Sequence, residues 1–138
     1  MKRGDFSNEE EIRITFYGGE PLLSTERIVS ISQKIRSFWE NKGLKYSFSL
    51  VTNGTLLTPA IIDRLLQLGL KSAKVTVDGP KEVHDAFRPF KSGAGSFDVI
   101  VRNISDVCDR IRIQIGGNYT QGPTGNSPGS LTISWRRG

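Results

Sequence analysis

The residues whose types and spacing could do chemistry lie between positions 16 and 23, where the sequence reads Phe-Tyr-Gly-Gly-Glu-Pro-Leu-Leu. Gly18 and Gly19 carry no side chain, so a ligand can approach the main chain closely here. Glu20 offers a carboxylate that accepts hydrogen bonds from a cationic group such as an amino acid's ammonium. A strand-to-helix connection needs one glycine at most, and a glutamate held between glycine and Pro21 is not ordinary turn chemistry. We therefore expect a ligand site at this point.

Three later segments have a similar composition, and each follows a run of apolar residues. They are Thr52-Asn53-Gly54-Thr55, Asp78-Gly79-Pro80 and Gly116-Gly117-Asn118. In parallel α/β folds the loops after the carboxyl ends of the strands build the ligand site, so we expect all four segments to line one crevice. Glycine, asparagine and proline also serve ordinary turns, and the amide of Asn53 can bridge backbone groups as well as contact a ligand.

The elements that must position these segments follow from apolar periodicity and capping residues. Alternation predicts strands at 12–17, 46–50, 73–77 and 111–115; helical spacing predicts helices at 24–43, 58–69 and 96–108, with an irregular stretch before the last. Strands that alternate with helices in this way predict βαβ units and a parallel sheet. We expect an α/β fold, namely part of a barrel with about four parallel strands.

Composition disfavours several classes of function. The 138 residues carry a net charge of +5, but the lysines and arginines are scattered, which argues against nucleic-acid binding. No apolar run has the length of a membrane span or the character of a signal peptide, so we expect a cytoplasmic protein with no membrane partner. Cys108 is the only cysteine, so this sequence alone cannot build a disulfide framework or a thiolate-bound cluster. We expect Cys108 to be a small buried side chain.

The segment around His84 holds further polar candidates. His84 lies beside Asp85 and could act as a general base or metal ligand, although a lone histidine more often makes local hydrogen bonds. No second histidine is present, and we predict no metal site. Arg88 could pair with a carboxylate or phosphate, or simply be exposed. Gly93–Ser96 lacks the Walker lysine and the Rossmann glycine spacing, so we expect a hinge and a helix N-cap.

The character of the sequence changes at Gln121. Polar, turn-forming residues follow, and the apolar run Leu131–Trp135 has no helix after it. We expect a lead-in at residues 1–11, a partial barrel at 12–120, and a tail at 121–138 that is disordered or not native to the domain.

Four ordered segments resemble the radical S-adenosylmethionine (SAM) superfamily, in the branch of sulfatase-maturating and peptide-modifying enzymes. They are Phe16–Leu23, Val51–Leu57, Val77–Asp85 with Arg88, and Gly95–Phe97. The resemblance implies a partial (β/α)6 barrel in which Gly18, Gly19 and Glu20 hold the amino group of SAM, with Thr76 and Asp78 near its ribose. The full set of expected cofactor-binding residues is Gly18, Gly19, Glu20, Pro21, Asn53, Thr76, Asp78 and Asn118.

The same resemblance implies a [4Fe–4S] cluster held by a Cys-x3-Cys-x2-Cys loop after the first barrel strand, a protein or peptide substrate, and an electron donor. Those cysteines are absent, so we expect a segment of such an enzyme, inactive by itself, whose first strand and cysteine loop lie upstream. The alternative hypothesis is a cluster-free α/β module that binds a nucleotide or peptide. An incomplete barrel has open sheet edges, which predicts low stability or self-association.

Overall fold

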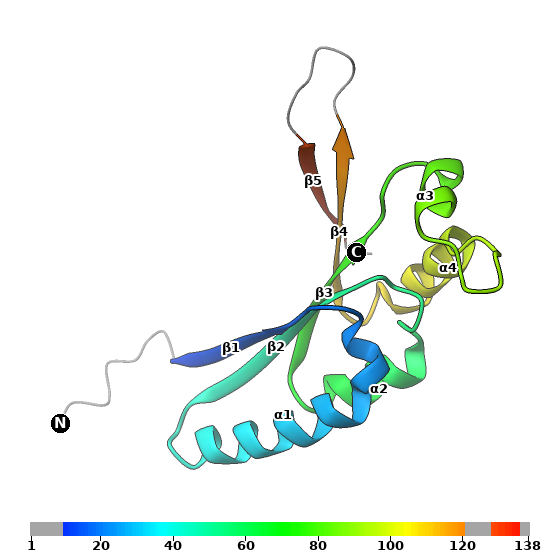
Figure 1. The fold of residues 1–138 in the computed structure, drawn as a ribbon. Helices are drawn as coiled ribbons and strands as arrows, with labels where there is room; N and C mark the ends of the chain where they lie inside the picture. Colours follow the sequence, from blue (N-terminus) through cyan, green and yellow to red (C-terminus); the bar gives the residue numbers. More distant parts are fainter. Residues whose placement is uncertain (1–9, 121–127, 136–138) are drawn as a thin grey trace.

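A computed structural model describes residues 10–120 and 128–135, which form one five-stranded sheet with helices between the strands (Figure 1). The strands lie in the order β1-β2-β3-β4-β5; the first four are parallel, and β5 is antiparallel to β4. In chain order the elements are β1 (Glu11–Phe16), the 3-10 turn η1 (Pro21–Ser24), α1 (Thr25–Glu40), β2 (Lys45–Thr52), α2 (Pro59–Leu66), β3 (Leu70–Thr76), α3 (Lys81–Phe87), α4 (Phe97–Val107), β4 (Arg112–Thr120) and β5 (Pro128–Trp135). Four parallel strands alternating with helices confirm the expected partial α/β barrel.

The helices α1, α2 and α4 lie along one side of the sheet, as Figure 1 shows. Alternation along β2 explains this arrangement, because Tyr46, Phe48 and Leu50 are buried and point to the helical side. The helices meet them with apolar stripes, of which Ile62 in α2 and Ile100 in α4 are almost fully buried. The main core therefore lies between the sheet and these helices, and the carboxyl ends of the strands carry the loops.

Helix α3 corrects the expectation of an irregular stretch between β3 and residue 95. Pro80 immediately precedes the helix with φ of −60°, a value that suits entry into a helix. The seven-residue segment Lys81–Phe87 has no long apolar period, so its sequence carries little helical signal. Its buried side chain is His84, whose hydrogen bonds rather than apolar packing fasten the helix.

The expected loop at Gly116–Asn118 is wrong, because these residues continue β4 and pair with β5. A Cβ on Gly117 would lie 1.9 Å from the carbonyl oxygen of Val77, so glycine permits a very close approach of the two backbones. The Val77 N–H also donates to the Gly116 carbonyl at 2.9 Å. The glycines at this point serve strand packing. Asn118 lies in β4 opposite Ser130, and its side chain is outside what the structure describes.

The tail also differs from the expectation over part of its length. Residues 128–135 form β5, whereas 121–127 and 136–138 lie outside the described residues. The alternating run Leu131–Trp135 was the sequence signal for this strand. That the tail is not native to the domain stays a prediction.

Candidate functional site

The turn after β1 leaves free space beside its backbone. Gly18 and Gly19 have φ of +92° and +53°, a region that side chains of L residues disfavour. A Cβ built on either glycine would meet no atom within 4 Å. Their conformation therefore favours glycine, while no neighbouring side chain among the described residues fills the space beside them. This combination is what close approach of a ligand to the main chain requires.

Glu20 joins the loop after β1 to the end of β2. The Thr52 hydroxyl donates to both carboxylate oxygens at 2.7 Å, and the Asn53 N–H donates to Oε2 at 3.1 Å. The Leu22 N–H reaches Oε1 at 3.4 Å, so the side chain also caps η1. A carboxylate offers about four acceptor positions. The three donor groups bring three protons, because the Thr52 hydroxyl has a single proton for both oxygens, so one acceptor position remains. Glu20 thus links the loop after β1 to the end of β2, and it can still accept a hydrogen bond from the predicted ammonium group.

The loop after β2 is held by its own side chains. The side-chain oxygen Oδ1 of Asn53 accepts from the Thr55 N–H at 2.9 Å and from the Thr55 hydroxyl at 2.8 Å, and Thr52 Oγ1 accepts from the Gly54 N–H at 3.1 Å. These contacts give Asn53 the turn-forming role that its sequence left open. Its contact with a ligand stays a prediction, and the side-chain NH₂ group is the part that could make it.

Asn103 is a site-supporting residue that sequence reasoning missed. Its amide donates from α4 to the carbonyl oxygens of Gly54 at 2.9 Å and Thr55 at 3.1 Å, and the side chain is almost fully buried. The available signal was a polar residue on the stripe that Ile100, Ile104 and Val107 otherwise make apolar. A buried amide is hydrogen-bonded as a rule, so such a position indicates a partner in a neighbouring loop.

The loop after β3 is organised around Asp78. Arg88 forms an ion pair with its carboxylate, and the Asp78 N–H donates to His84 Nδ1 at 3.2 Å. His84 is fully buried in α3, and burial lowers the pKa of its imidazole below the ordinary value. The expected local hydrogen-bonding role is confirmed, although the residue lies in a helix. Thr76, at the end of β3, pairs with Gly116 in the sheet.

The structure also bears on metal binding and on membrane insertion. Among the described residues no group of three or more histidine, cysteine or acidic side chains is placed to hold a metal ion. Cys108 is fully buried and contacts the Ser105 carbonyl at 3.5 Å, which confirms its expected burial. None of the helices at 10–120 combines the length and apolarity needed to cross a bilayer.

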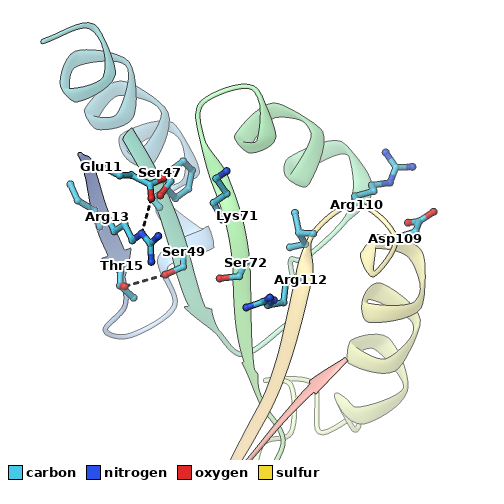
Figure 2. A pocket seen from close by; sticks show the side chains of 13 residues that line it. Glu11, Arg13, Thr15, Ser47, Ser49, Lys71, Ser72, Asp109, Arg110 and Arg112 are labelled. Atoms are coloured by element: carbon cyan, nitrogen blue, oxygen red, sulfur yellow. Dashed lines mark hydrogen bonds and ion pairs between the residues drawn. The ribbon is translucent and has the colours of Figure 1, made fainter. Parts of the chain in front are cut away.

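A polar hollow of about 610 Å³ opens over strands β1 to β4 and extends along β1 as far as Thr15 and along β2 as far as Ser49 (Figure 2). Figure 2 shows Arg13, Thr15 and Ser49 on β1 and β2, with Lys71 and Arg112 on the neighbouring strands. Within it, Arg13 pairs with Glu11 at 2.7 Å, and the hydroxyls of Thr15 and Ser49 lie 3.1 Å apart. The residues that line this hollow do not include Gly18, Gly19 or Glu20, so it is separate from the candidate site.

Comparison with known proteins decides the family. The model of the radical SAM superfamily matches residues 5–126. This chain belongs to the radical SAM superfamily. The superfamily uses SAM together with a [4Fe–4S] cluster, as the sequence resemblance implied.

Two relatives and one solved structure illustrate the kinds of radical SAM protein that this chain resembles. The chain is 31% identical over 107 residues to Fe-coproporphyrin III synthase of Methanosarcina barkeri, covering 78% of this chain and 24% of that protein. It is 31% identical over 116 residues to mycofactocin maturase MftC of Mycobacterium tuberculosis, covering 75% and 25%. The structure of anSMEcpe with bound AdoMet and Kp18Cys peptide superposes with a TM-score of 0.66 at 25% identity, covering 79% and 30%. The chain thus spans less than a third of the length of each of these three proteins.

The residues present fit one of the two cofactors. Open backbone at Gly18 and Gly19, beside a carboxylate with spare acceptor capacity, suits the amino group of SAM. The cluster does not fit these residues. Its usual ligands are several thiolates, whereas the sequence has one cysteine and Cys108 is buried.

Proposed function

We propose that this chain is the part of a radical SAM enzyme that binds SAM between the ends of β1, β2 and β3. The observation that carries the proposal is the turn at Gly18 and Gly19, open to a ligand and tied by Glu20 to the end of β2. Three loops far apart in the sequence converge at this end of the sheet, which is where such folds bind ligands.

In this proposal, different residues contact different parts of SAM. Backbone groups of Gly18 and Gly19, with the remaining acceptor position of Glu20, hold the amino group, and Pro21 fixes the exit of the turn into η1. We assign Thr76 and Asp78 to the ribose side and the NH₂ group of Asn53 to a further ligand contact. Asn118, in β4, is a further candidate for ligand binding. Each assignment rests on the motif match together with position at the carboxyl end of a strand.

The substrate is a protein or peptide. MftC is a maturase by name, and the anSMEcpe structure contains a bound peptide. Fe-coproporphyrin III synthase, of comparable identity, acts on a different class of molecule by its name. The peptide assignment is favoured because a structural match of TM-score 0.66 covers 79% of this chain in a protein with peptide bound.

The cluster ligands would have to come from outside these 138 residues, so the chain by itself is inactive in SAM cleavage. SAM held by Gly18, Gly19 and Glu20 would, after one-electron reduction by the cluster, supply hydrogen-atom abstraction from the substrate. The contribution of this chain is to bind and orient SAM at the ends of three strands. The complete enzyme would be cytoplasmic and would need an electron donor.

The test uses the gene product that contains this chain together with a Cys-x3-Cys-x2-Cys segment, reconstituted with iron and sulfide without oxygen. After reduction with dithionite, we expect 5′-deoxyadenosine and methionine from SAM by mass spectrometry. A Gly19→Ala variant should bind the cluster, seen by its absorption, but form much less 5′-deoxyadenosine. A protein with a complete cluster and intact SAM after reduction would contradict the proposal.

The second candidate function is a cluster-free module that binds a nucleoside or peptide without chemistry. It is favoured by the single cysteine and its burial. Loss of the iron would remove strong oriented contacts to SAM, which a carboxylate cannot replace, so such a module should prefer other ligands. The source locus separates the two: an upstream cysteine loop in the same reading frame supports the enzyme, and its absence supports the module.

A further inference from the structure

Four hydrogen bonds form a closed circuit around Asp78. The Asp78 N–H donates to His84 Nδ1 at 3.2 Å, and His84 Nε2 lies 3.0 Å from the hydroxyl of Ser96. The Ser96 hydroxyl donates to the carbonyl oxygen of Arg88 at 2.6 Å. The Arg88 guanidinium in turn donates to the Asp78 carboxylate, which closes the circuit. Both the backbone and the side chain of Asp78 are therefore held by the same ring of contacts.

The circuit requires one protonation state of His84. Because Nδ1 accepts the Asp78 N–H, it carries the lone pair, and the imidazole proton lies on Nε2. Nε2 then donates to Ser96 Oγ, and the Ser96 proton is free for the Arg88 carbonyl. A doubly protonated imidazole would face the Asp78 N–H with a second donor, so the circuit holds only when His84 is neutral.

The neighbourhood of the imidazole is tightly built. His84 is fully buried and Ser96 almost fully, while the Phe97 ring meets the imidazole edge-on with centroids 5.9 Å apart. The charged groups that act on His84 are Asp78 and Arg88 within the circuit and Asp85 on α3. Asp85 also accepts the Phe97 N–H at 2.8 Å, so α3 is fastened to the first turn of α4 by a second contact.

A glycine makes this second contact possible. A Cβ on Gly95 would lie 2.2 Å from a carboxylate oxygen of Asp85, so no larger residue fits while Asp85 bonds α4. Loop, α3 and the start of α4 therefore form one unit, and the circuit links that unit to the end of β3. The sequence separates these groups by up to 18 residues, from Asp78 to Ser96, and the fold brings them into contact.

We propose that His84 is a positioning residue for the candidate ligand site. In its neutral form its Nδ1 accepts the Asp78 N–H and so fixes Asp78 at the end of β3, while Nε2, through Ser96, joins the ring to the Arg88 carbonyl. This inference rests on the proposed function, since Asp78 is one of the groups assigned to the ribose side of SAM. His84 and Ser96 act through Asp78 and contact no ligand themselves.

Two substitutions of His84 distinguish the role of Nδ1 from the role of Nε2. In His84→Asn the amide oxygen can replace Nδ1 as acceptor for the Asp78 N–H, whereas in His84→Gln the longer amide reaches the position of Nε2 and leaves that N–H without its acceptor. A Cys108→Ala variant, buried at the far end of α4 and outside the circuit, is the control for general loss of stability.

Hydrogen exchange of the Asp78 amide in the 138-residue chain gives the first readout. We expect His84→Gln to speed exchange at least about tenfold, equivalent to about 1.4 kcal/mol, with His84→Asn much closer to the unmodified chain. Equal acceleration in both variants, or the same acceleration in Cys108→Ala, would overturn the proposal. His84 is the only histidine, so its imidazole NMR signals also report directly on the unmodified chain. A proton on Nδ1 rather than Nε2 would refute the circuit.

Ligand binding gives the second readout and separates this inference from the proposed function. With S-adenosylhomocysteine as probe, followed by NMR titration, we expect about tenfold weaker binding by His84→Gln and recovery in His84→Asn. The unmodified chain should also bind less tightly as the pH falls through the imidazole pKa. Unchanged affinity in His84→Gln despite faster Asp78 exchange would overturn the positioning role. No binding by the unmodified chain would count against the proposed function, while the exchange data would still judge the circuit.

Discussion

The bond between Thr52 and Glu20 makes the sharpest prediction about the site's framework. Thr52→Val keeps the shape of the side chain but removes the donor to both carboxylate oxygens at 2.7 Å. A hydrogen bond to a charged group contributes roughly 1.5–3 kcal/mol. The change also removes the acceptor of the Gly54 N–H, a neutral bond worth about 1 kcal/mol. We expect a total loss of about 3 kcal/mol in the free energy of unfolding.

A double-mutant cycle isolates the contact itself. Urea unfolding, followed by circular dichroism, is measured for the unmodified chain, Thr52→Val, Glu20→Gln and the double variant. The coupling free energy should be about 1.5 kcal/mol, within the range for residues in contact. Thr52→Ser, which keeps the hydroxyl, is the matched control and should lose only the smaller contribution of about one methyl group, near 1 kcal/mol. Coupling below about 0.5 kcal/mol, the usual error of additivity, would refute the assigned contact.

The remaining predictions concern the glycine turn, the buried amide and the pH. Gly19→Ala and Gly93→Ala both place a side chain at positive φ in open space, so each should lower the free energy of unfolding by roughly 1–2 kcal/mol. Calorimetry should find weaker binding of S-adenosylhomocysteine only for Gly19→Ala. Equal losses of binding in the two variants would contradict the assignment of the site to the glycine turn. Asn103→Ala leaves two carbonyl groups without their donor and should lower the free energy of unfolding, measured in urea, by about 2 kcal/mol. The control Arg102→Ala, on the exposed side of α4, should change it little. The folded-state pKa of His84 is lowered, so its contribution to stability is present above the ordinary imidazole pKa and is lost as pH falls toward the folded value. Unfolding free energy should therefore decrease between pH 7.5 and pH 5.5, with a shallower decrease in His84→Asn, and equal slopes would exclude the imidazole as the cause. Sedimentation should reveal concentration-dependent association through the exposed sheet edges, whereas a sharp melt independent of concentration would argue for a self-sufficient domain.

The fold was largely predictable because its strands and long helices carry strong periodicity. Alternation at Tyr46, Phe48 and Leu50 marked β2, and Thr58 with Pro59 marked the start of α2. Helix α3 escaped detection because it is short and is fastened by polar contacts rather than an apolar stripe. Those contacts join residues whose proximity depends on the tertiary fold.

The position of the glycine turn was more predictable than the contacts around it. The glycines at 18 and 19 stand at a strand end, as their type indicated, and Glu20 follows them. That the Glu20 carboxylate is largely engaged by β2 depends on strand order and register, which local sequence does not encode. The glycines at 116 and 117 show the converse error, because the same residue type permitted close packing of strands instead of a ligand turn.

The most direct test of the central claim is an NMR titration of the ¹⁵N-labelled 138-residue chain with SAM. We predict that the amide signals of Gly18, Gly19 and Asn53 shift together, with weak affinity because this chain lacks cluster ligands. Shifts confined to the polar hollow around Lys71 and Arg112, or no shift at the glycine turn when SAM is in large excess, would contradict the claim that these strand ends bind SAM.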